Sequence, residues 1–155
     1  FDPLHCDADL EEIVTSAYEN EIAIVFRKVE ECIECGGITQ DELSSLPVLA
    51  VLGQRLANLE RKMKAFLISQ GIDEVSINSS GKTCHTNKAT LGQLSFNIEI
   101  QRALRGYDDI YKLHLFRNEL FHDWFAEDSK PIPIARIKTN LDLLCRIEDG
   151  QPFGP

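Results

Sequence analysis

The segment that most constrains the fold is DDIYKLHLFRNELFHDWF, residues 108–125. At about 100° per residue, its large apolar side chains fill one broad arc of a helix that Asp108 can cap. These side chains are Ile110, Leu113, Phe116, Leu120, Phe121, Trp124 and Phe125. Arg117 falls inside the arc, where its permanent charge needs a carboxylate, a carbonyl or an anionic ligand. The segment therefore predicts a core helix that also holds an ion-paired or ligand-binding arginine.

Polar side chains follow the edge of the same arc. His114, Asn118 and His122 recur at i, i+4 and i+8. Arginine binds phosphate oxygens bidentately, and histidine transfers protons near neutral pH. RNA cleavage without a metal needs both properties, because the 2′-hydroxyl is deprotonated while the phosphorane gains charge. We expect His122 to be the general acid or base, Arg117 to bind phosphate, and Asn118 to assist Arg117.

The motif Arg117-Asn118-x-x-x-His122 resembles the RNxxxH signature of the HEPN superfamily. That superfamily comprises small all-helical domains, many of them metal-independent endoribonucleases of toxin, antiviral and RNA-processing systems. The resemblance implies that these three residues are catalytic, and that a homodimer joins two motif helices across a dyad. Trp124 stands where some HEPN toxins carry a tyrosine that partner antitoxins modify, so regulation through that position is not expected here.

Other side chains of the motif helix are candidates to line the cleft. They are His114, Glu119 and Asp123. The two acidic residues can orient His122 or repel RNA, and a packing or capping role for His114 is an equal alternative. Leu115 projects from the polar side of the helix, where a partner subunit can cover it.

The remaining pattern predicts further helices. Residues 7–35 fit one long helix that Asp7 caps and Gly36-Gly37 ends. A capping box of Thr39 and Glu42 precedes a second long helix, from near Ser45 to Gly71. Its basic residues, including Arg61 and Lys64, are expected on a solvated face, with a position beside an RNA path as the alternative.

Residues 71–88 are polar and non-periodic, which indicates a loop or an insertion. Thr90 can cap a helix over 90–104, with Ile98 among its inward positions, and residues 134–147 fit a last helix. Residues 150–155 are expected to be a frayed tail. We therefore predict an all-α, HEPN-like bundle of about four to five helices, formed by residues 1–155 as a single domain.

The net charge and the lengths of the apolar runs indicate which partners the protein can have. The net charge of −9 argues against a broad basic surface that coats nucleic acid, but it is compatible with basic groups that converge in one cleft. Apolar runs fall short of the about 18 residues that a membrane span needs. We expect a cytoplasmic protein with no membrane or DNA partner. The first residue is Phe1, which suggests an excised domain or a processed chain.

The five cysteines lack the spacing of a disulfide framework. They are Cys6, Cys32, Cys35, Cys84 and Cys145. Reduced cytosolic thiols are the favoured interpretation, without metal or cofactor. The alternative is a zinc site of three cysteines and one histidine, built from Cys32-x-x-Cys35 and Cys84-His85.

The sequence thus predicts a HEPN-type endoribonuclease that acts on RNA as a homodimer, with an antitoxin or another regulatory protein as a further partner. A non-catalytic HEPN-like module for dimerisation or for binding RNA or protein is the main alternative. An unrelated helical bundle that binds another protein is the third, and a monomer in solution would favour it.

Overall fold

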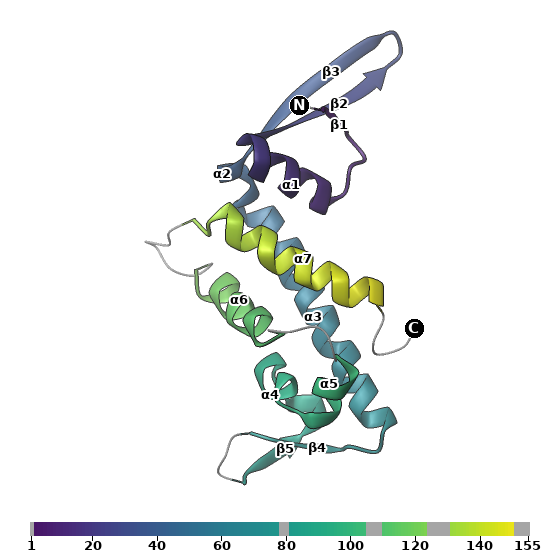
Figure 1. The fold of residues 1–155 in the computed structure, drawn as a ribbon, viewed down its shortest axis with the longest axis vertical. Helices are drawn as coiled ribbons and strands as arrows, with labels where there is room; N and C mark the ends of the chain where they lie inside the picture. Colours follow the sequence, from purple (N-terminus) through teal and green to yellow (C-terminus); the bar gives the residue numbers. More distant parts are fainter. Residues whose placement is uncertain (1, 78–80, 105–109, 124–130, 151–155) are drawn as a thin grey trace.

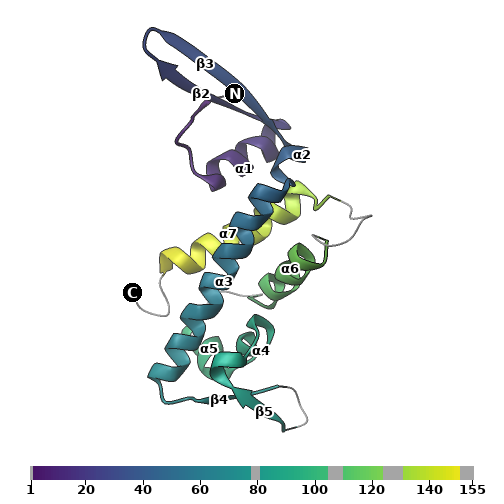
Figure 2. The same ribbon diagram turned by 180° about the vertical axis from the view of Figure 1, so that it is seen from behind.

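Helix α3 (Leu46–Ser69) is the longest helix that the structure describes, and the helices that follow it in the sequence pack against it (Figures 1 and 2). The computed structural model describes residues 2–77, 81–104, 110–123 and 131–150. Helices α6 (Ile110–Asp123) and α7 (Ile134–Gly150) lie beside the middle of α3. Asp108, Trp124, Phe125 and the predicted tail after Gly150 lie outside the described residues.

The predicted helix over residues 7–35 is wrong beyond Asn20. Helix α1 (Leu10–Asn20) starts with a capping box between Asp9 and Glu12, and Glu21 ends it with a φ of 65°. Strands β2 (Ile22–Val29) and β3 (Cys32–Thr39) then form an antiparallel hairpin, and β1 (Leu4–His5) pairs with β2 in parallel. This sheet projects from one end of the molecule (Figure 1).

The residues of the hairpin explain why a strand replaces the helix. Ile22–Val29 is rich in β-branched residues, which favour strands. Glu30, at a φ of 54°, provides the left-handed turn between β2 and β3. The expected helix stop at Gly36-Gly37 is instead part of β3, where the Ile22 side chain lies so close that a Cβ on Gly37 would meet it at 2.6 Å. Ile33, within the predicted helix, lies on β3 instead and is 69% exposed.

A second small sheet occupies the other end. Strands β4 (Glu74–Ser76) and β5 (Thr83–His85) are antiparallel, and the short 3₁₀ helix η1 (Thr86–Lys88) follows. The loop predicted over 71–88 is therefore wrong for these elements, while the alternative of an insertion stays a prediction. Buried Thr86 donates its hydroxyl to the carbonyl of Ile72 at 2.7 Å, which ties the segment to the end of α3.

The two sheets also overturn the all-α prediction, since 62% of the described chain is helical and 18% is strand. The predicted helix over 90–104 is in fact two, α4 (Leu91–Ser95) and α5 (Ile98–Ala103). Asn97 separates them by capping α5 with its side chain. Ile98 consequently faces outward and is 58% exposed.

Other local predictions are confirmed. Thr39 and Glu42 form the capping box of α2 (Gln40–Leu43), and Thr90 and Gln93 form that of α4. Ser45 is the N-cap of α3, with proline in its first turn. Helix α7 starts at Ile134, where the sequence predicts it. Its apolar residues Ile137, Leu141, Leu144 and Ile147 are buried.

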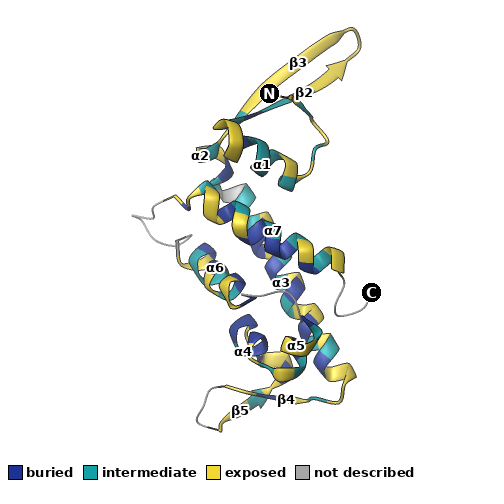
Figure 3. Ribbon diagram, in the orientation of Figure 1, coloured by how far each residue is buried: buried dark blue, intermediate teal, exposed yellow. Residues whose placement is uncertain are grey.

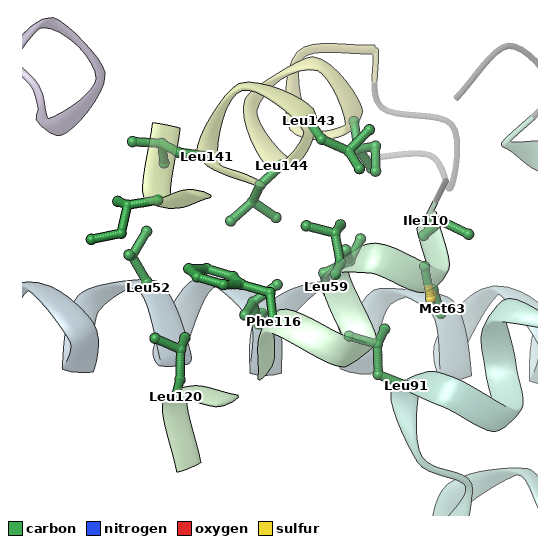
Figure 4. Close-up of a cluster of buried hydrophobic side chains, with 14 of the residues drawn as sticks. Leu52, Leu59, Met63, Leu91, Ile110, Phe116, Leu120, Leu141, Leu143 and Leu144 are labelled. Carbon is green, nitrogen blue, oxygen red and sulfur yellow. The ribbon is translucent and has the colours of Figure 1, made fainter. Parts of the chain in front are cut away.

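The core lies between α3, α6 and α7 (Figures 3 and 4). Side chains from the three helices meet there, including Leu52 and Leu59 from α3, Phe116 from α6 and Leu144 from α7. Each is at most 3% exposed. Full burial of such side chains contributes about 1.5–3 kcal/mol each, so this packing fixes the orientation of α6.

Arg55 of α3 ties the N-terminal part of the chain to α7. Its Nη2 atom donates to Glu11 of α1 at 2.9 Å and to Glu148 of α7, and it also contacts the thiol of Cys145. The hydrogen bond to Glu148 raises the pKa of Arg55 above its ordinary value. Burial opposes this increase, and the hydrogen bonds to Glu11 and Cys145 add to it. These contacts cross-link three helices that are distant in sequence.

Candidate functional site

The motif helix α6 is anchored by the apolar face that its sequence predicts. Leu113, Phe116 and Leu120 are at most 2% exposed and pack into the core. Ile110 is 8% exposed, whereas Phe121, predicted in the same apolar arc, is 38% exposed. This anchoring determines which of the polar motif side chains are covered by α3 and α4 and which face solvent.

Arg117 lies half-buried between α6 and α3. Its Nη2 atom is 3.9 Å from Oε2 of Glu60, and its guanidinium carbon is 4.9 Å from the ring centroid of Phe121. The Nε atom is buried and has no hydrogen-bond partner among the described residues. A guanidinium has five N–H donors, so the long contact to Glu60 leaves most of them available to an anion.

Glu60 is the residue that the sequence interpretation missed. Its side chain is only 15% exposed, and it accepts from Nζ of Lys64 at 2.7 Å and from the backbone N–H of Leu91 at 3.0 Å. Its position supplied a signal, because Glu60 follows Leu56 by one helical turn and precedes Met63 by another, within the apolar stripe of α3. The expectation of a solvated face fails for Lys64, whose side chain is 18% exposed, and holds for exposed Arg61.

His114 packs against α4 at the other side of Arg117. Its Nε2 atom is 3.2 Å from Nδ2 of Asn118, while its Nδ1 atom is buried without a partner in the described chain. Gly92 provides the space for the ring, since a Cβ at this glycine would meet three ring atoms at 2.7–2.8 Å. Burial lowers the pKa of His114, as does the positive charge of Arg117, against the opposing effect of Glu60.

His122 is exposed, one helical turn beyond Asn118. It forms no hydrogen bond or ion pair with any residue that the structure describes. The structure therefore brings Arg117 and Asn118 together with His114 and Glu60, and it leaves His122 accessible at the rim. A proton donor or acceptor at this place can reach a ligand that approaches from solvent.

The predicted acidic neighbours differ in position. Glu119 points toward α7 and forms an ion pair with Nε of Arg136 at 2.9 Å, although the angle does not make a hydrogen bond. The side chain of Asp123 lies outside the described residues. Leu115 is 43% exposed and lines a hollow of about 490 Å³ between α6 and α7.

The proposed zinc ligands are not brought together. Cys32 and Cys35 lie on β3 at one end of the molecule, whereas Cys84 and His85 lie on β5 at the other (Figure 1). Within the described ranges, the single group of three close metal-ligand types is His5, Cys6 and Asp7, with ligand atoms within 4.8 Å of one another. These are consecutive exposed residues at the end of β1, so chain connectivity alone places them together.

No model of a known protein family matches the chain, and neither a curated protein nor a solved structure matches it significantly. In the described part of the chain, no helix has both the length and the apolar character needed to cross a membrane. The geometry around α6 is therefore the basis for a functional proposal.

Proposed function

We propose that the chain is an endoribonuclease of HEPN type that cleaves RNA without a metal ion. The observation that carries the proposal is the half-buried Arg117, held beside Asn118 with an unpartnered Nε atom, while His122 stands exposed on the same helix. Buried polar atoms without partners are uncommon and often occur at functional sites. The proposal depends on the motif and its surroundings and not on an all-helical fold.

The chemistry assigns a role to each motif residue. A histidine takes the proton of the 2′-hydroxyl as that oxygen attacks phosphorus, and the bond from phosphorus to the 5′-oxygen breaks. Arg117 and Asn118 stabilise the charge on the phosphoryl oxygens. The leaving 5′-oxygen takes a proton from another side chain, which acts as the general acid. The products end in a 2′,3′-cyclic phosphate and a 5′-hydroxyl group.

A homodimer supplies the general acid. One protomer offers His122 as a base, and His122 of the other protomer can serve as the acid when two α6 helices meet across a dyad. Exposed Leu115 and the hollow beside it offer apolar surface on α6 for such an interface. A cytoplasmic toxin–antitoxin or antiviral system, with a regulatory partner that restrains the activity, fits this chemistry.

A non-catalytic module for dimerisation or binding is the second candidate. Two observations favour it: Arg117 already contacts Glu60 and Phe121 of its own chain, and the net charge of −9 disfavours RNA. In that case Arg117 stabilises α6 against α3, and His122 has no catalytic part.

Cleavage of a mixed pool of single-stranded RNA and tRNA in EDTA separates the two candidates. We expect the wild type to release 2′,3′-cyclic phosphate ends, and His122→Ala to lose this activity by at least about 100-fold while remaining dimeric. His5→Ala is the matched control, since His5 is also exposed but lies on β1. A folded wild-type dimer without cleavage, or equal activity in His122→Ala, would refute the nuclease.

A further inference from the structure

Aromatic rings connect the surface of α4 and α5 with the motif helix. Phe96, at the end of α4, is 65% exposed, and its ring centroid lies 5.0 Å from that of Tyr111 on α6. Tyr111 is 41% exposed and lies 5.4 Å from His114, which in turn contacts Asn118 at 3.2 Å. Exposed aromatic rings next to a phosphate-binding candidate offer stacking surfaces for nucleobases.

A pocket of about 290 Å³ lies next to the exposed Phe96 ring. It is lined by Ser76 of β4, Gln93 of α4, Phe96, Asn97 and Ile98 of α5. This volume is at the lower end of the range for small-molecule sites, so it suits one planar ring system and not an extended ligand. Its lining combines apolar faces with two side-chain amides.

The two amides have a fixed orientation because their oxygens cap helices. Oε1 of Gln93 accepts from the backbone N–H of Thr90 at 2.8 Å, and Oδ1 of Asn97 accepts from that of Glu99 at 2.9 Å. The –NH₂ groups are therefore the ends left for a ligand. Neither Nε2 of Gln93 nor Nδ2 of Asn97 donates a hydrogen bond within the described residues. Two residues of the pocket lining thus carry amide donors that no described residue uses.

We propose that this pocket binds a guanine base of a single-stranded RNA, with Phe96 stacking on the base and Gln93 and Asn97 donating to it. Guanine carries two acceptors, O6 and N7, side by side on one edge. Adenine places a donor beside N7, cytosine presents a donor, and uracil has one acceptor on the corresponding edge. This inference rests on the proposed function, because it adds a base preference near the site of cleavage.

The charge of the protein agrees with recognition by stacking. With a net charge of −9, the chain has little capacity to gain affinity by releasing counterions from the RNA backbone. Stacking on aromatic side chains and hydrogen bonds to base edges depend less on salt. The RNA affinity should therefore fall much less steeply with salt than that of a basic RNA-binding protein.

Binding of fluorescent ten-nucleotide RNAs tests the proposal. The His122→Ala variant of the 155-residue chain, used to prevent cleavage, is titrated with oligouridine that contains one central guanine, adenine or uracil. We expect the guanine RNA to bind about tenfold more tightly than the adenine RNA. Adding Phe96→Ala should weaken guanine RNA binding by about tenfold or more. Ile33→Ala, which removes an equally exposed apolar side chain from β3, should leave it unchanged.

Asn97→Asp tests the proposed hydrogen bond from the Asn97 amide to guanine most directly. The aspartate keeps the oxygen that caps α5 but replaces the –NH₂ donor with an acceptor. Because the added charge weakens all RNA binding, the readout is the ratio of guanine to adenine affinities, which should fall from about ten to one or below. Equal affinities in the parent protein, or an unchanged ratio in Asn97→Asp, would overturn the proposal. So would guanosine monophosphate competing as tightly as the guanine RNA, since a free nucleotide would then be the ligand.

The two proposals fail in different ways. Cleavage that depends on His122, without any preference for guanine, would refute the pocket assignment and leave the nuclease intact. A guanine preference lost in Asn97→Asp, in a protein that never cleaves RNA, would refute the nuclease and support the pocket as part of a binding module.

Discussion

Two helical glycines allow a matched test of how the candidate site is packed. In Gly92→Ala, the new Cβ would lie 2.7 Å from Cε1 and Nε2 of His114 and 2.8 Å from Cδ2. In Gly53→Ala, the nearest atom is Cζ of Phe121 at 4.0 Å, an ordinary contact. Replacing glycine by alanine should therefore lower the stability of the fold at position 92 and raise it at position 53.

The magnitudes follow from two opposing terms. Replacing a helical glycine by alanine stabilises the folded state by roughly 0.5–1 kcal/mol, because the unfolded chain then has fewer backbone conformations to lose. Overpacking costs about 1–3 kcal/mol when neighbours cannot move freely. Movement of His114 is opposed, because its ring packs on Tyr111 and its Nε2 atom hydrogen-bonds to Asn118. Gly92→Ala should thus destabilise by about 1–2 kcal/mol, whereas Gly53→Ala should stabilise by the full helical term.

Thermal unfolding measures the difference. For a chain of this size, 1 kcal/mol shifts Tm by about 2–4 °C, so Gly92→Ala should lower Tm by roughly 2–8 °C and Gly53→Ala should raise it slightly. In a His114→Ala background the clash is gone, and Gly92→Ala should become stabilising. If Gly92→Ala stabilises the wild type as Gly53→Ala does, then His114 does not pack on α4 as described.

Two further predictions concern the contacts between α1, α3 and α7. Burial opposes ionisation of Glu11, but hydrogen bonds from Cys145 and Arg55 outweigh it and hold its pKa below the ordinary 4.5. Ionised Glu11 therefore stabilises the fold above about pH 4.5 and loses this effect as the pH falls through the lower folded pKa. In urea unfolding, Glu11→Gln should be less stable than wild type at pH 7, and this difference should shrink as the pH falls below 4.5. A difference that stays constant with pH would contradict this. Burial and the bond to Glu11 raise the pKa of Cys145 to about 12, against the effect of Arg55. Its alkylation by iodoacetamide at pH 8 should therefore be at least about tenfold slower than that of an exposed thiol, because far less of it is present as thiolate. Peptide mass spectrometry measures that rate, and labelling of Cys145 as fast as exposed Cys32 would refute the contact.

The sequence predicted the helical elements whose signals are local. The caps at Thr39 and Thr90 were identified because a cap involves residues within about four positions of each other. The apolar arc of α6 was also correct in Leu113, Phe116 and Leu120, since helical periodicity needs no knowledge of the partner surface.

The β-hairpin was not predicted because its two strands stabilise each other. Val14 and Ala17 of α1 are buried at helical spacing, and the apolar residues that continue to Ile33 extend the same pattern. The chain instead changes direction at Glu21, and the pairing of Ile22 with Thr39 joins residues 17 positions apart. The helical period of 3.6 residues concerns neighbours along the chain, so it gives no information about this competing pairing between strands.

The sequence by itself placed Arg117, Asn118 and His122 on one amphipathic helix and required a partner for the buried guanidinium. Only the tertiary structure decided that the partner is Glu60 and that the glycine beside the site, Gly92, makes room for His114. These contacts join α6 to α3 and α4 across more than twenty residues of sequence. Their cause is the packing of three separate helices around a shared core, which the order of residues along any one helix does not specify.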